Sequence, residues 1–253
     1  TRVIEEAFDR GVNYLYWGTF RRSAFGRAMR NLARKAREEL VLTVQSYARV
    51  PALIEPSVDV ALLRTQVGYF DILLLGAHNE KPRRGYVEVF ERLREKGKVR
   101  FLALSTHNRP LLPTLFDAGD GTGFLDVAML RYNAAHRGAE KDVFRFLPRE
   151  RPPGVIAYTA TRWGHLLDPT KMPEGQSPPA ASDCYRFALS HPAVDLVLCG
   201  PADRAQMQEA LRALERGPLD PDEMKRMHEI GDHVYAAHKP YVADRGDSPE
   251  ARA

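Results

Sequence analysis

The fold is most clearly encoded in one nine-residue stretch, Gly97-Lys98-Val99-Arg100-Phe101-Leu102-Ala103-Leu104-Ser105. The glycine ends a preceding charged helix, and the apolar run after it closes on a hydroxyl residue. This order is typical of one helix-to-strand step of a parallel (β/α)8 barrel, in which the carboxyl ends of the strands build the active site. Ser105 is therefore expected at the mouth of such a barrel.

The same alternation of apolar runs and amphipathic segments continues along the whole chain. The predicted strands cover residues 13–17, 40–46, 70–75, 99–105, 125–131, 155–159 and 195–199. The predicted helices cover residues 23–38, 56–65, 85–96, 110–117, 140–147, 182–190 and 203–216, with a terminal helix over 221–238. Apolar strands joined by helices predict a parallel sheet.

The fold class is therefore expected to be α/β, a (β/α)8 TIM barrel. Seven strands are visible in the pattern, and an eighth is expected upstream of Thr1, so the barrel is expected to lack its first strand here. Residues 1–240 are predicted to form one barrel domain, and residues 241–253 a flexible C-terminal tail.

Composition narrows the classes of partner. The chain of 253 residues has 37 basic and 33 acidic side chains, and this small surplus is spread over many helices, so no nucleic-acid partner is expected. Cys184 and Cys199 have no spacing typical of a disulfide framework or a metal site. The spacing of His228, His233 and His238 is off one helical face, so no metal is expected. The sequence has no apolar run of membrane-spanning length and no signal peptide. We therefore expect no membrane partner and a cytoplasmic location.

Six segments, in chain order, resemble the aldo-keto reductases, a family of NADPH-dependent (β/α)8 oxidoreductases. The matching segments are residues 7–14, 69–75, 97–105, 131–133 (Arg-Tyr-Asn), 154–159 and 197–200, the last followed by a helix that carries Glu209. The resemblance implies the barrel fold over nearly the whole chain.

The catalytic groups that the resemblance implies are replaced. The family uses a Tyr as general acid, a Lys that lowers the pKa of this Tyr, an Asp that orients the Lys, and a His that orients the carbonyl. Tyr16 stands at the position of the Asp, Phe20 falls near that of the Tyr, Gln45 replaces the Lys and Gly76 replaces the His. No catalytic residue is therefore expected in the family pattern.

Two side chains are weak candidates for a relocated proton donor. Tyr16 carries a phenol, although it can equally plug the former pocket together with Trp17. His78 lies two residues after Gly76 and can swing into the mouth. Its alternative role is that of a loop histidine that caps backbone carbonyls.

The resemblance implies a partly kept nicotinamide site. Ser105 matches the hydroxyl that contacts the nicotinamide amide, while Thr106 replaces an Asn there and Met129 replaces a Gln. Tyr158 matches the aromatic ring that stacks on the nicotinamide.

At the phosphate end of the implied cofactor site, Gly200 begins a turn whose backbone N–H groups can bind a phosphate at a helix N-terminus. Gln206 replaces the Arg that the resemblance implies for the 2′-phosphate, and Asp203 would repel a phosphate, which Arg204 offsets in part. Binding of NADP or NAD is therefore possible but expected to be weakened.

A second group of polar residues leaves two interpretations open. Arg131, Asn133, His136 and Arg137 follow one strand, and the run 162–165 (Arg-Trp-Gly-His) follows the next. They can bind a small, anionic ligand, or they can form a charged mouth covered by water.

Three functions remain open from the sequence. The leading hypothesis is a degenerate family member, which acts as a binding or regulatory barrel or runs altered chemistry. The alternative is an active NAD(P)H-dependent oxidoreductase that reduces an aldehyde or ketone with a relocated proton donor. A purely structural interaction protein is the third. The sequence leaves the oligomeric state unknown.

Overall fold

A computed structural model describes residues 2–18, 23–116 and 123–237 of the chain. The chain forms two compact units. The first comprises Thr1–Thr106 with Leu115–Val127, and the second comprises His107–Thr114 with Ala128–Ala253. The predicted tail over 241–253, and also Phe20, lie outside the described residues.

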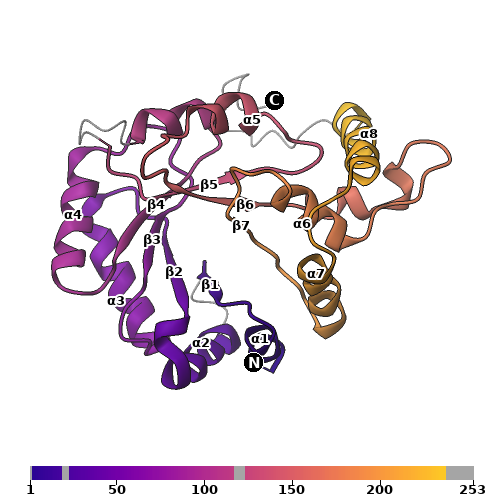
Figure 1. Ribbon diagram of the computed structural model, residues 1–253. Coiled ribbons are helices and arrows are strands. Elements are labelled where there is room, and N and C mark those ends of the chain that lie inside the picture. The colour runs from indigo at the N-terminus through magenta and orange to yellow at the C-terminus, as the bar shows by residue number, and fades with distance from the viewer. Residues whose placement is uncertain (1, 19–22, 117–122, 238–253) are drawn as a thin grey trace. The chain divides into compact units, whose positions relative to one another are not determined.

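The first unit contains four parallel strands that neighbour one another in chain order (Figure 1). These strands are β1 (Tyr14–Trp17), β2 (Val41–Ser46), β3 (Ile72–Leu75) and β4 (Phe101–Ser105). The helices are α1 (Arg2–Asp9), α2 (Ser23–Ala36), α3 (Ile54–Thr65) and α4 (Arg84–Glu95), with the short 3-10 helices η1 (Arg37–Glu39) and η2 (Pro51–Leu53). Every residue of β3 is buried, as expected for a parallel strand with both faces covered.

The register of these strands brings their carboxyl ends to one edge. Gln45 pairs with Leu74, and Ser46 pairs with Leu75. Beyond the ladder, the backbone N–H of Gly76 donates to the carbonyl of Ser46 at 3.0 Å, which continues the alignment one residue further. The residues that follow each strand therefore gather at the same edge of the sheet.

The second unit holds the rest of the strand and helix repeat. Its strands are β5 (Val127–Arg131), of which all but the first residue belongs to this unit, β6 (Gly154–Tyr158) and β7 (Leu196–Val197), and β6 pairs with β7 in parallel. The helices are α5 (Ala139–Asp142), α6 (Ala181–Leu189), α7 (Arg204–Arg216) and α8 (Pro221–Ala237), with the 3-10 helices η3 (Arg109–Leu115), η4 (Phe144–Phe146), η5 (His165–Leu167) and η6 (Pro169–Lys171). Seven strands alternating with helices give the α/β architecture of a (β/α)8 barrel, of which the described residues supply seven strands.

Three predicted elements differ in the structure. The predicted helix over 110–117 is the 3-10 helix η3, with Pro113 inside it, because proline lacks the N–H that an α-helix requires there. The predicted helix over 140–147 is divided into α5 and η4 at Val143, whose φ of −132° is not helical. The predicted last strand over 195–199 is reduced to the two residues of β7.

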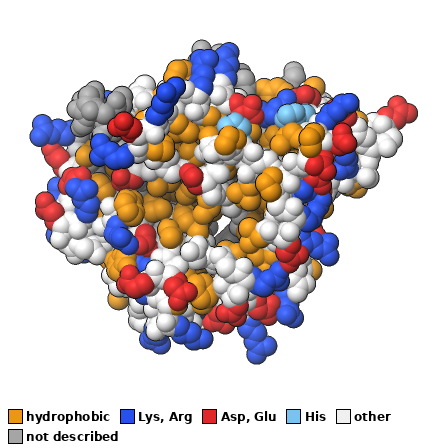
Figure 2. Space-filling model, in the orientation of Figure 1, with side chains coloured by type: hydrophobic (Ala, Val, Ile, Leu, Met, Phe, Trp, Pro, Cys, Tyr) orange, Lys and Arg blue, Asp and Glu red, His pale blue; other side chains and the backbone are white. Residues whose placement is uncertain are grey.

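Charged side chains of both signs lie among hydrophobic ones on the face drawn in Figure 2. On that face, Lys and Arg are interspersed with Asp and Glu. Within the described residues, no helix is long and apolar enough to cross a membrane.

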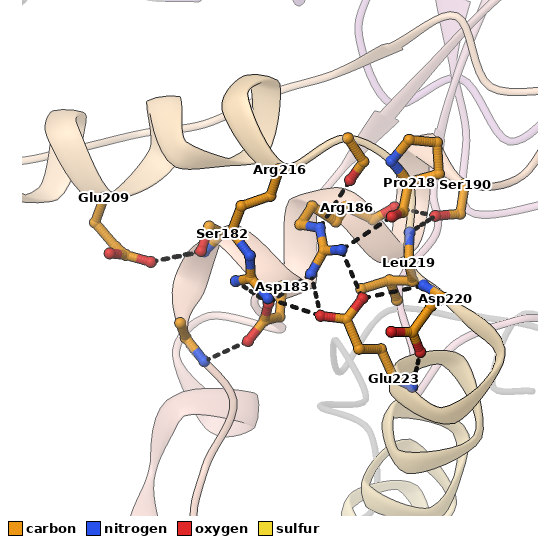
Figure 3. A network of polar contacts seen from close by, with 12 residues as sticks. Ser182, Asp183, Arg186, Ser190, Glu209, Arg216, Pro218, Leu219, Asp220 and Glu223 are labelled. Carbon is orange, nitrogen blue, oxygen red and sulfur yellow. Dashed lines mark hydrogen bonds and ion pairs between the residues drawn. The ribbon is translucent and has the colours of Figure 1, made fainter.

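Ion pairs around the buried side chain of Arg186 join α6, α7 and α8 in the second unit (Figure 3). The guanidinium of Arg186, on α6, donates to Glu223 on α8 at 2.5 Å and to Asp183 at 3.2 Å. It also donates to the carbonyl of Gly217, at the end of α7, at 2.7 Å. Arg216 bonds to both carboxylates as well, at 2.5 and 2.7 Å. These bonds fix the three helices to one another around one side chain.

Candidate functional site

Ser105 ends β4 and is buried at the mouth of the first unit. Its hydroxyl oxygen accepts a hydrogen bond from the backbone N–H of Ala77 at 2.9 Å, and its carbonyl accepts one from the N–H of His78, also at 2.9 Å. Ser105 therefore fixes the loop after β3. Its hydroxyl proton is still available to donate to a ligand, because accepting a bond uses only a lone pair.

Thr106 and Arg49 also form hydrogen bonds with the loop after β3. Thr106 is buried, and its hydroxyl donates to Asn79 Oδ1 at 3.1 Å. Arg49 donates to the carbonyls of Gly76 at 2.8 Å and Ala77 at 3.1 Å. This role of Arg49 could not be predicted from the sequence, because the contact joins two loops that no local pattern relates.

Gln45 fills the space beside Gly76. A Cβ atom placed on Gly76 would lie 1.9 Å from Gln45 Nε2 and 2.8 Å from its Cδ. A histidine at position 76 is therefore incompatible with the present position of Gln45. The two positions where the resemblance implies a catalytic Lys and a catalytic His thus form a complementary pair, an uncharged amide against a residue without a side chain.

His78 lies next to this pair and is buried. Its ring packs edge-on against Tyr86 of α4, with 5.1 Å between the ring centroids. Burial, and then the nearby Arg49 guanidinium, lower the pKa of His78 from 6.5 to about 4. The ring is therefore neutral at pH 7, and its buried Nε2 makes no hydrogen bond in the structure.

Tyr16 is half-buried near the end of β1. A Cβ atom on Gly18 would lie 2.8 to 2.9 Å from the Tyr16 ring and hydroxyl, so the ring lies directly over the backbone that leaves β1. Both the proton-donor and the plug interpretation of Tyr16 fit this position.

In the second unit, Tyr158 is the last residue of β6 and is half-buried, as a ring that stacks on a ligand requires. Met129 and Arg131 lie two residues apart on β5 and therefore on one face of the strand. The sequence left Arg131 open as part of an anion-binding group or of a charged, water-covered mouth, and the structure buries its side chain.

A carboxylate of the chain itself caps the N-terminus of α7. Asp203 caps this helix, and its Oδ1 accepts the backbone N–H of Gln206 at 2.8 Å. Gln206 in turn accepts the N–H of Ala202 at 2.9 Å. The carboxylate thus occupies the helix end that would attract a phosphate. Gly200 and Arg204, the other two residues implied there, are exposed.

Three buried basic side chains lie close enough to His136 for their charges to lower its pKa. Arg131 ends one predicted strand, Arg162 follows the next, and Arg109 of η3 was not expected there from the sequence. Arg109 pairs with Asp142 at 2.9 Å. Arg137, in contrast, points outward to Asp232 at 2.6 Å. Within the described residues, no group of three or more His, Cys, Asp or Glu side chains is arranged to hold a metal ion.

No family model and no curated protein matches this chain. Solved structures do. The holo form of the aldo-keto reductase AKR11C1 from Bacillus halodurans superposes with a TM-score of 0.72 at 20% identity, over 96% of this chain and 88% of that one. The apo form of the same protein gives a TM-score of 0.71 at 19% identity, with the same coverage. The chain therefore has the fold of an aldo-keto reductase, and at this level of identity the likeness establishes the fold alone.

Proposed function

We propose that this protein is an aldo-keto reductase-like barrel that does not reduce carbonyls by the family mechanism and that acts as a binding or regulatory protein for a small molecule. The observation that supports this most is the Gln45 and Gly76 pair. A Cβ atom on Gly76 would lie 1.9 Å from Gln45 Nε2, so the two replacements fit each other within one packed site.

The chemistry lost at this site is large. An uncharged amide at position 45 cannot lower the pKa of a neighbouring phenol as an ammonium does. A positioned proton donor contributes about 10²- to 10⁴-fold to the rate of such a reaction. Without both groups, hydride transfer to a carbonyl has no acid to protonate the developing alkoxide.

The residues present fit a dinucleotide only in part. Ser105 and Tyr158 suit a nicotinamide amide and ring, and one matched structure is described as a holo form. The phosphate end does not fit, because Asp203 already supplies a carboxylate to the first turn of α7. We therefore expect NADP or NAD to bind weakly.

The alternative is an NAD(P)H-dependent oxidoreductase that reduces an aldehyde or ketone with a relocated proton donor. Tyr16 supports it, because its phenol lies near the end of β1, where the family has a catalytic residue. His78 supports it less, since a pKa of about 4 leaves almost no acid form at pH 7.

Two measurements separate these functions. The first is a titration with NADPH and NADH in which quenching of tryptophan and tyrosine fluorescence reports binding. The second is an assay of dinucleotide oxidation by aldehydes. We expect weak binding and no turnover. Micromolar binding with turnover of any aldehyde would overturn the proposal, and loss of that turnover in Tyr16→Phe would establish the alternative.

A substitution at the phosphate end tests the stated cause of weak binding. Asp203→Ser keeps a capping hydroxyl but removes the charge, so it should tighten dinucleotide binding by about two- to fivefold. The pair Gln45→Lys and Gly76→His should not produce turnover, because Phe20 supplies no phenol.

A further inference from the structure

His136 lies in the tight turn after β5, with 2% of its surface exposed. Its Nδ1 lies 3.4 Å from Asn133 Oδ1, and its Nε2 is buried and makes no hydrogen bond in the structure. Buried polar atoms in proteins nearly always form a hydrogen bond, so the partner of this nitrogen is expected to be a ligand or a water molecule.

The hydrogen bonds of Asn133 assign the tautomer of His136. Asn133 Nδ2 donates to the carbonyl of Thr159 at 2.8 Å, and its Oδ1 accepts the backbone N–H groups of Ala135 and His136 at 3.0 Å each. The atom that faces His136 Nδ1 is therefore an acceptor, and Nδ1 must carry the proton. It follows that Nε2 presents a lone pair and requires a donor.

Three buried guanidinium groups act on this ring. They belong to Arg109, Arg131 and Arg162, which are 4%, 8% and 2% exposed and come from three separate segments. Burial, and then these three cations, lower the pKa of His136. Burial and the charge of Arg131 also lower the pKa of Arg162, so these two guanidiniums lie close enough to repel each other.

Helix α8 covers the same cluster. The Arg162 guanidinium donates to the carbonyl of Val234 at 2.5 Å, and Tyr235 packs edge-on against His136 with 5.5 Å between ring centroids. Gly231 permits this close approach, because a Cβ atom there would lie 2.1 Å from the carbonyl oxygen of Ala134. These contacts hold Arg162 and the turn that carries His136 against α8.

We propose that Arg109, Arg131, Arg162 and His136 form a binding site for a small oxyanion that carries a hydroxyl group, such as hydrogen phosphate or a hydroxycarboxylate. The charged oxygens of the ligand bind the guanidiniums, whose planar array of donors suits oxyanions. In this position the oxygens also reduce the repulsion between the positive charges. The hydroxyl of the ligand donates to His136 Nε2. This inference names the ligand class for the binding function proposed above and rests on it.

Phosphate and sulfate distinguish this site from a general anion site, since phosphate carries a proton near pH 7 and sulfate does not. We expect calorimetric titration at constant ionic strength to show binding of phosphate and at least tenfold weaker binding of sulfate, because one hydrogen bond of this kind is lost. Glycolate should likewise bind better than acetate. Equal binding of the two members of a pair, or no binding of any of these anions, would overturn the proposal.

Substitutions assign the roles of the side chains. Arg131→Met should weaken phosphate binding by about tenfold or more, and His136→Leu should remove the preference for phosphate over sulfate. Arg137→Gln is the matched control, because Arg137 belongs to the same turn but pairs with Asp232, so its phosphate affinity should equal that of the unmodified protein.

A spectroscopic measurement on the unmodified protein keeps the proposal testable if these variants do not fold. With ¹⁵N-labelled histidine, the Nε2 signal of His136 should move on addition of phosphate and stay in place with sulfate. An unchanged signal at saturating phosphate would overturn the proposal. These experiments contain no dinucleotide or aldehyde, so their failure is distinct from a failure of the non-reductase proposal, which turnover alone would reveal.

Discussion

Gln45 Nε2 lies 1.9 Å from the point where a Cβ atom of residue 76 would be, and Gly76 has no such atom. The resemblance noted in the sequence implies two independent replacements at these positions. In the structure they are one packing unit, because either side chain occupies the volume that the other would need.

This packing predicts a coupling between the two residues. Gly76→Ala should lower the free energy of unfolding by about 0.5 to 1.5 kcal/mol, because the new methyl group forces the flexible end of the Gln45 side chain out of its present position. In the background of Gln45→Ala the same change should cost much less. Gly200→Ala is the matched control and should be close to neutral, since no atom lies within 4 Å of its Cβ position. Urea unfolding of the four combinations measures the coupling, and additive effects at positions 45 and 76 would contradict it.

The residue scale is also where the sequence was least informative. It indicated Ser105 at a strand end, and the structure confirms that position, but the bond from Ala77 that occupies its hydroxyl oxygen was not foreseen. Nor was the convergence of Arg109 on His136. Both contacts join residues that are distant along the chain, so no local spacing reports them.

At the scale of elements, the side chain of Arg186 joins α6 to both α7 and α8. Its guanidinium bonds to the Glu223 and Asp183 carboxylates and to the end of α7 (Figure 3). The hydrogen bond from Arg186 is the main reason that the pKa of Glu223 falls from 4.5 to about 2.

Arg186→Met should therefore destabilise the protein by about 3 kcal/mol, because it leaves partly buried carboxylates with fewer partners. Arg212→Gln is the matched control. Arg212 lies on α7 and bonds to Glu209 at 3.2 Å, but 65% of its side chain is exposed, so its loss should cost less than about 1 kcal/mol. Chemical unfolding compares the two variants. An equal loss of unfolding free energy in both would contradict a larger contribution of Arg186 to stability.

The element scale also separates good sequence predictions from poor ones. Strands β1 to β6 were located to within two residues at either end because long apolar runs bounded by turns leave little choice. The helix predicted over 110–117 was wrong in type, and the one predicted over 140–147 is an α-helix only in its first part, since short amphipathic segments do not distinguish an α-helix from a 3-10 turn.

At the scale of the whole molecule, buried histidines should make stability depend on pH. The pKa of His78 is lowered from 6.5 to about 4, and that of His136 from 6.5 to about 3. The unfolded chain therefore binds more protons than the folded chain below pH 6.5, and stability falls as the pH falls from 6.5 towards 4. Each histidine contributes at most about 1.4 kcal/mol per pH unit in this window.

Urea unfolding between pH 8 and pH 4, in chloride rather than phosphate, measures this dependence. His78→Phe should keep the packing against Tyr86 and reduce the slope by close to one proton. A slope identical to that of the unmodified protein would contradict the burial of a neutral His78. Below pH 4.5 a second loss should follow, because the pKa values of Glu55 and Glu223 are lowered to about 2 by their hydrogen bonds to basic side chains.

The sequence by itself determined the order of strands and helices and the α/β barrel class, because periodic burial of apolar side chains is a local property that each segment carries alone. It also located the ends of the strands, and hence which residues reach the mouth. Only the tertiary structure decided what those residues do there. Gln45 closes the space over Gly76, Asp203 neutralises its own helix end, and Arg109 joins Arg131 and Arg162 around His136. Such outcomes depend on distances and desolvation across segments that are remote in sequence, and these exist only once the chain has packed.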